Sequence, residues 1–387
     1  MSVPDTVLDR IRRKVREYSW DDFVAPADAS DWRYGPPPTW MRGLCEYWSS
    51  HYDWRAQEAA INALPQFIAD VDGRSLHFVH ERGSGAAPRP LLLVHGWPYS
   101  FNSYARLVER LAHPERFGGR EEDAFSVVVP SLPGYGFSDR PLTPIGPLRI
   151  AEIFDRLMTE VLGYEHYVVH GGDWGSAIAE MLGFYHAARV DGIHLTMLSV
   201  RHHGAAPRTN DVPFDATAEE RAFASREASL WRDESAYARI QATKPLKLAY
   251  AMADSPVGAA AWIVEAFHAW ADLRNRRFDD VFTRDGLLTE VMLYLVNGAF
   301  NASTWIYVAE VREKAVTLPA GERIEVPVAI AAYSDPVFPA VPRAVAELSH
   351  NVVLYTEMDD GGHFPFYEAP EPLLQNLFAF SASVVRR

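Results

Sequence analysis

An aspartate stands at the apex of a glycine-rich turn, where strand-like residues give way to helix-like ones. Residues 168–181 read VVHGGDWGSAIAEM, and Asp173 lies in their middle, after two glycines and before Trp-Gly. In this small-x-nucleophile-x-small pattern the central residue is held at a strained positive φ, and small neighbours let the following helix pack close. Because such turns usually present a nucleophilic serine, Asp173 is a candidate nucleophile. An Asp that merely caps the helix is the alternative, and the stretch alone leaves both open.

Two further side chains could work with this carboxylate. His363 lies in DDGGHFPF and Asp335 in YSDPVFP, each directly after a predicted strand. The chain order nucleophile, acid, histidine is that of catalytic triads at strand-to-helix turns, so Asp335 is the predicted relay acid. Each member also has an ordinary explanation, since Asp before proline forms local turns and many histidines are structural. Asp359 and Asp360 are fallback acids, less suited because they precede His363 so closely.

A carboxylate nucleophile restricts the type of substrate. Attack on an acyl carbon would give a mixed anhydride, which is no sensible route to ester hydrolysis. Attack on an sp³ carbon that bears a leaving group gives an alkyl ester, which a His-activated water can cleave. Epoxides and alkyl halides are the two common substrates of this kind. Backbone N–H groups of Trp97, in HGWP, and of Trp174 are the predicted oxyanion hole for ester cleavage. His95 and Tyr99, on the Trp97 loop, are predicted substrate contacts.

Alternating strands and helices must bring these residues together. Apolar, β-branched runs end in glycine or proline at PLLLVHGW (residues 90–97) and FSVVVPSLPGYGFSD (125–139), and similar runs begin at Val168, Gly192, Val326 and Asn351. Continuous apolar strands separated by helical stretches predict a parallel sheet covered on both faces. In such sheets the chemistry gathers at the carboxyl ends of the strands. We therefore expect four side chains to meet at one edge, since each follows a strand: His95, Asp173, Asp335 and His363.

Two segments lie outside this pattern. Between Leu198 and Val326 more than a hundred residues lack sheet character, and residues 255–270 and 287–311 have helical apolar spacing. An insertion there predicts a lid over the strand ends. The N-terminal segment contains a helix, a Trp- and Pro-rich arm and an Asp-Gly hairpin signal at Asp72. The predicted parts are an N-terminal arm (1–85), the first part of the core (86–200), a helical lid (201–318) and the second part of the core (319–387).

Composition excludes several classes of function. The chain has 387 residues, 48% of them hydrophobic, and a formal net charge of −14. This charge argues against a nucleic-acid partner, because phosphate binding needs a basic surface. The basic cluster at residues 10–16 alternates with apolar residues and predicts the solvated face of an amphipathic helix. Cys45 is the single cysteine, so a disulfide framework within one chain is excluded. The sequence indicates no metal, no cofactor, no membrane span and no signal peptide, and so predicts a soluble cytoplasmic protein.

The sequence resembles a known family. The motifs HGWP, GGDWGS and GGHF resemble those of the epoxide hydrolases of the α/β-hydrolase fold. Residues 46–67 and DGRSLHFVH are similar to the N-terminal region of the microsomal and juvenile-hormone type, and YARIQATKP with DSPVGAAAWIVE to its lid. The resemblance covers nearly the whole chain. It implies an α/β class protein with the α/β-hydrolase fold, a helical lid and an N-terminal extension. The implied reaction opens a hydrophobic or aromatic epoxide to a vicinal diol.

The resemblance also implies two lid tyrosines, Tyr237 and Tyr307, that hydrogen-bond the epoxide oxygen. An alkoxide leaving group near neutral pH needs a proton or strong donors, and a Tyr hydroxyl of pKa about 10 can supply both. The sequence departs from the family in two places. Tyr99 follows HGWP where the family has a small residue, which would reshape the site. Asp335 stands where the microsomal branch often has Glu.

Two other functions stay open at this stage. A haloalkane-type dehalogenase would share the aspartate, the histidine and the ester, with indole N–H groups such as that of Trp174 stabilising the halide. A non-catalytic ligand-binding α/β-hydrolase is a more remote alternative, which the complete Asp-Asp-His set disfavours. The predicted partners are an epoxide and water, and the oligomeric state is open between a monomer and a homodimer. Similar bacterial members act in natural-product biosynthesis, including enediyne pathways, which is a further expectation from the resemblance.

Overall fold

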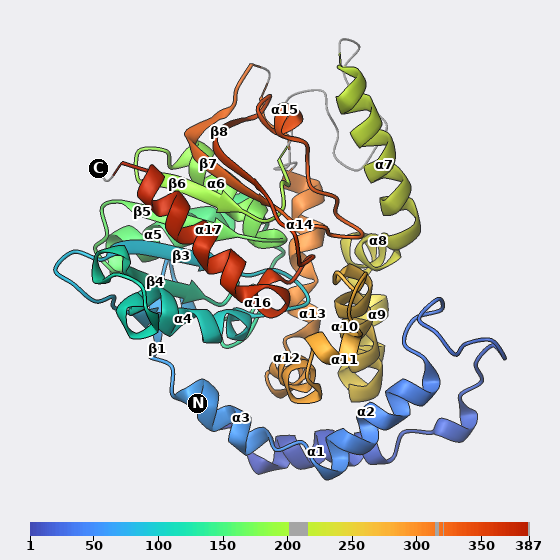
Figure 1. Cartoon of the computed structure of the whole chain (residues 1–387). Coiled ribbons are helices and arrows are strands. Elements are labelled where there is room, and N and C mark those ends of the chain that lie inside the picture. The colour runs from blue at the N-terminus through green and yellow to red at the C-terminus, as the bar shows by residue number, and fades with distance from the viewer. Residues whose placement is uncertain (201–215, 314–316, 320, 386–387) are drawn as a thin grey trace.

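The structure is a computed structural model that describes residues 1–200, 216–313, 317–319 and 321–385. Within these residues eight strands form one sheet in the order β1-β2-β4-β3-β5-β6-β7-β8 (Figure 1). Strand β2 runs antiparallel to β1 and β4, and the other neighbours are parallel. The strands are β1 (Gln66–Val71), β2 (Arg74–Glu81), β3 (Arg89–Val94), β4 (Phe125–Pro130), β5 (Tyr167–Gly171), β6 (Val190–Leu195), β7 (Ile324–Ala332) and β8 (His350–Glu357).

Helices cover both faces of the sheet, as the apolar strands predict. Every residue of β4, β5 and β6 is buried, which is why these strands read as continuous apolar runs. Figure 1 shows α4 and α17 on the near face and α5 and α6 behind the sheet. The predicted α/β-hydrolase fold is confirmed. The helices that cover the sheet are α4 (Ala105–Ala112), α5 (Pro147–Arg156), α6 (Trp174–Tyr185), α15 (Arg343–Ala346), α16 (Pro365–Glu368) and α17 (Pro370–Ser383).

Between β6 and β7 the described residues form eight helices and no strand. These helices gather beside the carboxyl edge of the sheet, with α14 packed on α8 (Figure 1). The lid predicted over residues 201–318 begins outside the described residues, so its first boundary stays a prediction. The lid helices are α7 (Ala218–Glu234), α8 (Ala236–Thr243), α9 (Pro245–Asp254), α10 (Pro256–Trp270), α11 (Phe278–Val281), α12 (Arg284–Val296), α13 (Phe300–Ser303) and α14 (Trp305–Glu313).

The N-terminal arm packs against the lid. Its helices α1 (Asp5–Arg16), α2 (Pro38–Ser50) and α3 (Trp54–Asn62) run along the bottom of Figure 1, below α10 and α12. The Tyr47 hydroxyl donates to Asp285 on α12 at 2.8 Å, and the Trp32 ring stacks on His268 of α10 with centroids 3.8 Å apart. As predicted, α1 is amphipathic and buries one apolar stripe, which consists of Leu8, Ile11 and Val15. The arm therefore braces the lid from the side away from the sheet.

Short elements complete the described chain. The predicted hairpin is confirmed, because Asp72 and Gly73 both take positive φ and join β1 to β2. No helix in the described ranges combines the length and the apolar character that a bilayer crossing requires. The remaining single turns are η1 (Trp20–Asp22), η2 (Phe101–Tyr104), η3 (Pro114–Phe117), η4 (Glu121–Asp123) and the π-type turn η5 (Leu157–Val161).

Candidate active site

The turn between β5 and α6 presents the Asp173 carboxylate. Asp173 has φ +51°, which is the strained geometry that its small neighbours predict. A Cβ on Gly175 would collide with the carbonyl of Val94, and one on Gly171 with the carbonyl of Gly175. The Asp173 side chain makes no capping hydrogen bond to α6 within the described residues. The helix-cap alternative is therefore wrong, because the Asp173 side chain does not cap the helix that it precedes.

A histidine and a second carboxylate stand in line with Asp173. His363 Nε2 lies 3.5 Å from Asp173 Oδ2, and His363 Nδ1 is 2.7 Å from Asp335 Oδ2. The other oxygen of Asp335 accepts the N–H groups of Val337 and Phe338 at 2.9 and 2.8 Å. Asp335 thus stabilises the local turn with Oδ1 and holds the histidine with Oδ2. The fallback acids, Asp359 and Asp360, are exposed, and the structure pairs His363 with Asp335 instead.

The environment of His363 favours its charged form. Burial alone lowers its pKa, but the charge of Asp335 and the hydrogen bonds with Asp173 and Asp335 raise the pKa to about 9. The imidazole lies between two carboxylates and is therefore the charged imidazolium at neutral pH, as long as Asp173 is not esterified. Since Asp173 supplies part of this effect, neutralising its carboxylate would lower the pKa of His363 again.

The loop after β3 reaches the first oxygen of Asp173. The Trp97 N–H donates to Asp173 Oδ1 at 2.8 Å. This approach needs Gly96, because a Cβ there would collide with the Asp173 side chain. The N–H of Trp174, the second predicted donor, makes no hydrogen bond to Asp173 among the described residues. Of the two predicted donors, only the Trp97 N–H therefore binds Asp173 Oδ1 in the described residues.

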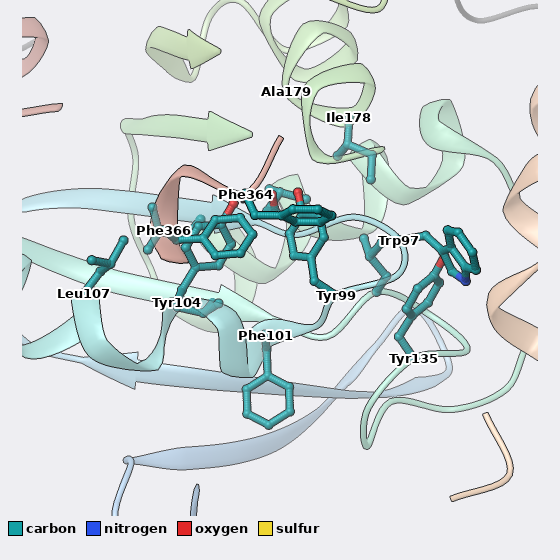
Figure 2. Close-up of a cluster of buried hydrophobic side chains, with 14 of the residues drawn as sticks. Trp97, Tyr99, Phe101, Tyr104, Leu107, Tyr135, Ile178, Ala179, Phe364 and Phe366 are labelled. Carbon is teal, nitrogen blue, oxygen red and sulfur yellow. Dashed lines mark hydrogen bonds between the residues drawn. The ribbon is translucent and has the colours of Figure 1, made fainter. Parts of the chain in front are cut away.

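His95 and Tyr99 lie behind the turn rather than in front of it. The fully buried His95 accepts the Leu132 N–H at Nε2 (3.0 Å), and its Nδ1 faces Gly96 O at 3.0 Å. Burial lowers the pKa of His95 to about 4, so its ring is neutral. The Tyr99 hydroxyl donates to Gly172 O at 3.0 Å, and Figure 2 shows its ring within the aromatic cluster that includes Phe366. Neither residue lines the cavity at Asp173, and their polar atoms support the backbone of the site instead.

A cavity of about 160 Å³ lies between Asp173 and the lid. Tyr237 from α8 and Tyr307 from α14 both line it. Their rings make an edge-to-face contact with centroids 6.1 Å apart, and both rings pack against Trp97. The Tyr307 hydroxyl and the indole N–H groups of Trp97 and Trp174 are buried without a hydrogen-bond partner in the described chain. The cavity lining is mostly apolar or aromatic and comprises Asp173, Trp174, Ala177, Met197, Ser199, Trp231, Tyr237, Ala238, Arg239, Ala242, Tyr307, Glu310, Val311 and Phe338.

Buried donors without partners are costly unless another molecule satisfies them. Burial raises the pKa of Tyr307 well above its usual range, and the nearby Tyr237 and Asp173 add to the effect. Its hydroxyl therefore stays protonated and can donate. The cavity lining thus combines the Asp173 carboxylate with the Tyr307 hydroxyl and the indole of Trp174. It suits a small molecule with an electrophilic carbon beside an electron-rich leaving atom.

Comparison with known proteins agrees with this geometry. Residues 1–104 match the family model described as epoxide hydrolase N terminus, and residues 89–370 match the alpha/beta hydrolase fold model. Epoxide hydrolase 1 of Sus scrofa is 31% identical to the chain, over 97% of this chain and 86% of its own. The chain belongs to the epoxide hydrolase family. Juvenile hormone epoxide hydrolase 2 of Ctenocephalides felis is 29% identical over 98% and 84% of the two chains. The structure of Aspergillus niger epoxide hydrolase superimposes with a TM-score of 0.83 at 29% identity, over 100% of this chain and 95% of the other.

Some residues of this epoxide hydrolase that line its cavity escaped the sequence analysis. Phe338 follows Asp335 by three residues, so its place beside the predicted relay acid could have been inferred from YSDPVFP. Trp231, on α7, carries no such local signal, because the lid brings it to the cavity from a distant helix. The described residues contain no group of three His, Cys, Asp or Glu side chains suited to a metal ion.

Proposed function

We propose that this epoxide hydrolase opens apolar, aromatic epoxides to vicinal diols through an ester on Asp173. The observation that carries the proposal is the placing of its two carboxylate oxygens. Oδ1 already accepts the Trp97 N–H, and Oδ2 lies beside His363. Oδ1 is therefore suited to become the carbonyl oxygen of an ester, and Oδ2 is suited to attack.

In the first step Asp173 Oδ2 attacks one ring carbon of the epoxide. The new C–O bond forms as the ring C–O bond breaks, and the electron pair of that bond moves to the ring oxygen. Tyr237 and Tyr307, on the lid side of the cavity, donate to this oxygen, and one of them gives it a proton. The products of the step are a hydroxyalkyl ester of Asp173 and a tyrosinate that solvent reprotonates.

In the second step a water molecule attacks the ester carbonyl carbon. Esterification has removed the charge of Asp173, so the pKa of His363 falls and the imidazolium releases its proton to solvent. The neutral imidazole can then accept the proton of water. Asp335 holds the imidazolium that forms, and the Trp97 N–H stabilises the negative charge on Oδ1. Collapse of the tetrahedral intermediate breaks the acyl C–O bond, and the leaving alkoxide takes the proton of the imidazolium to give the diol. The proton of the Asp173 carboxyl group then passes to His363, which restores the carboxylate and the imidazolium.

Styrene oxide tests this proposal because its phenyl ring matches the aromatic lining of the cavity. Release of phenylethanediol supports it, whereas absence of diol from any aryl epoxide would contradict it. The unpartnered indole N–H groups of Trp97 and Trp174 favour one second candidate, a dehalogenase, because such donors stabilise halide. A chloroalkane of similar size, with release of chloride as the readout, separates the two. Ligand binding without either product would indicate the non-catalytic alternative. A cytoplasmic location and the choice between monomer and homodimer stay predictions.

His363→Gln should separate the two steps. Glutamine cannot accept the proton of water, so ester hydrolysis should slow by about a thousandfold while Asp173 is still alkylated. Intact mass spectrometry after mixing with styrene oxide should show the protein plus one substrate mass. His350→Gln, at a buried histidine outside the cavity, is the control and should show no adduct at steady state. If His363→Gln accumulates no ester, this division of labour is wrong.

Asp335→Asn should cause a milder defect of the same kind. Without the neighbouring negative charge, the charged form of His363 loses its main support, and its pKa should fall below the value of about 9. NMR titration of the His363 ring proton, assigned by comparison with His363→Gln, measures this change. Diol formation should slow at the hydrolysis step. Near-wild-type activity would instead point to Asp359 or Asp360 as the relay acid.

A further inference from the structure

Three consecutive backbone N–H groups around His363 have defined acceptors. The Gly362 N–H donates to Glu368 Oε2 at 3.0 Å, and the Phe364 N–H donates to Glu368 Oε1 at 2.8 Å. Between them, the His363 N–H donates to Trp270 O at 3.1 Å. One carboxylate thus holds the peptide groups on both sides of the histidine, and no step of the mechanism above uses it.

Glu368 also connects the histidine loop to the lid. Its Oε2 accepts the Asp272 N–H at 2.7 Å, in the segment that follows α10. The fit between the two segments is close, because a Cβ on Gly362 would lie 2.6 Å from Asp272 N and 2.8 Å from Trp270 O. The Glu368 side chain is fully buried, and Arg276 is its one cationic partner in the described chain, at 3.9 Å. The carboxylate therefore lies where lid and core meet.

A carboxylate is costly in such a place. The pKa of Glu368 is raised to about 7, and burial is the largest cause. Asp335 also raises this pKa, whereas the N–H groups of Phe364 and Asp272 and the charge of Arg276 lower it. The Asp272 side chain is paired with Arg274. Burial raises the pKa of the nearby Tyr333, and the negative charge of Glu368 raises it further. An apolar residue would avoid this cost but would leave three buried N–H groups without acceptors. The cost is explained if the position of these N–H groups matters.

We propose that Glu368 is a positioning residue for His363, which sets the imidazole within reach of Asp173 by holding both flanking peptide groups and the adjacent lid segment. This inference rests on the proposed function. Two oxygens that accept three N–H groups define the path of the loop from both sides. A glutamine has one acceptor oxygen, and its NH₂ group would face N–H donors. The loop of Glu368→Gln should therefore relax and displace the histidine ring.

The test follows each chemical step of Glu368→Gln with styrene oxide in single turnover. Alkylation of Asp173 should stay close to the wild-type rate, because that step does not need His363 as a base. Hydrolysis of the ester should slow by about a hundredfold, the size expected for a catalytic group misplaced by about 1 Å. Glu58→Gln is the matched control: Glu58 is also buried and accepts the Val3 N–H at 2.7 Å, but it lies in the N-terminal arm. It should leave both steps unchanged.

Glu368→Asp gives a second measure of the same effect, and it decides the question should Glu368→Gln fail to fold. Aspartate keeps the charge but is shorter, so its hydrolysis rate should fall between those of wild type and Glu368→Gln. Equal slowing of both steps in these variants would show a purely structural role and overturn the inference. The inference would also be overturned if both single variants, Glu368→Asp and Glu368→Gln, hydrolysed the ester at the wild-type rate. If the wild-type enzyme forms neither ester nor diol, the proposed function itself fails, which is a separate result.

Discussion

Asp173→Ala should form no ester with any epoxide, and its turnover should fall by about a millionfold, the loss found when a covalent nucleophile is removed. The methyl side chain cannot attack the ring carbon. His363 is held by Asp335 and Trp270, so it should keep its place. Initial rates of diol release from styrene oxide, together with intact mass, measure the effect. Circular dichroism should be unchanged, because alanine removes a side chain that makes no helix cap.

Labelled water identifies the nucleophile more directly. In a single turnover in ¹⁸O water, the first diol should carry an oxygen from Asp173, and the solvent oxygen should appear in the protein. Peptide mass spectrometry should locate this label in the peptide that contains Asp173. Asp359→Asn, at an exposed carboxylate a few positions before His363 in the sequence, is the control and should behave as wild type. Solvent oxygen in the first diol would instead show direct attack by water.

The sequence predicts those residues whose position follows from the topology of the sheet. Asp173, Asp335 and His363 each follow a parallel strand, and parallel strands end at the same edge, so their meeting requires no knowledge of side-chain packing. The positive φ of Asp173 could also be predicted, because its small neighbours in the sequence impose a local steric constraint. Strand identity was recoverable because β4, β5 and β6 are buried on both faces.

Side-chain direction could not be predicted in this way. His95 and Tyr99 follow β3 as expected, yet their polar atoms turn to Leu132, Gly96 and Gly172 rather than to the cavity. Which way such a ring points depends on packing with residues that lie far away in the sequence. Glu368 was missed for a related reason, because one of the three N–H groups it accepts belongs to Asp272, 96 positions earlier in the chain.

After loss of the nucleophile itself, the largest effect on the first step is expected from the two lid tyrosines. Tyr307 is buried, its hydroxyl lacks a partner among the described residues, and its high pKa keeps the proton available for donation. Tyr237 also lines the cavity, and its ring is in edge-to-face contact with that of Tyr307. Each single change, Tyr237→Phe or Tyr307→Phe, removes one donor from the developing alkoxide and should slow alkylation by about a hundredfold. Ester hydrolysis should not change, since that step develops its charge on Asp173 Oδ1.

The double variant provides the stronger test because both hydroxyls are proposed to serve one oxygen. With no donor left, the ring oxygen would have to leave as a free alkoxide, and alkylation should slow by about ten-thousandfold. Stopped-flow tryptophan fluorescence can follow the step, because the tyrosine rings pack against Trp97 and Trp174, and intact mass gives an independent readout. Tyr52→Phe, which loses a buried hydroxyl in the arm, is the control and should alkylate at the wild-type rate. Wild-type alkylation by both single variants would make the tyrosines packing residues. The indole N–H groups would then be the remaining donors to the leaving atom, which is the arrangement a dehalogenase needs, and chloride release would become the decisive measurement.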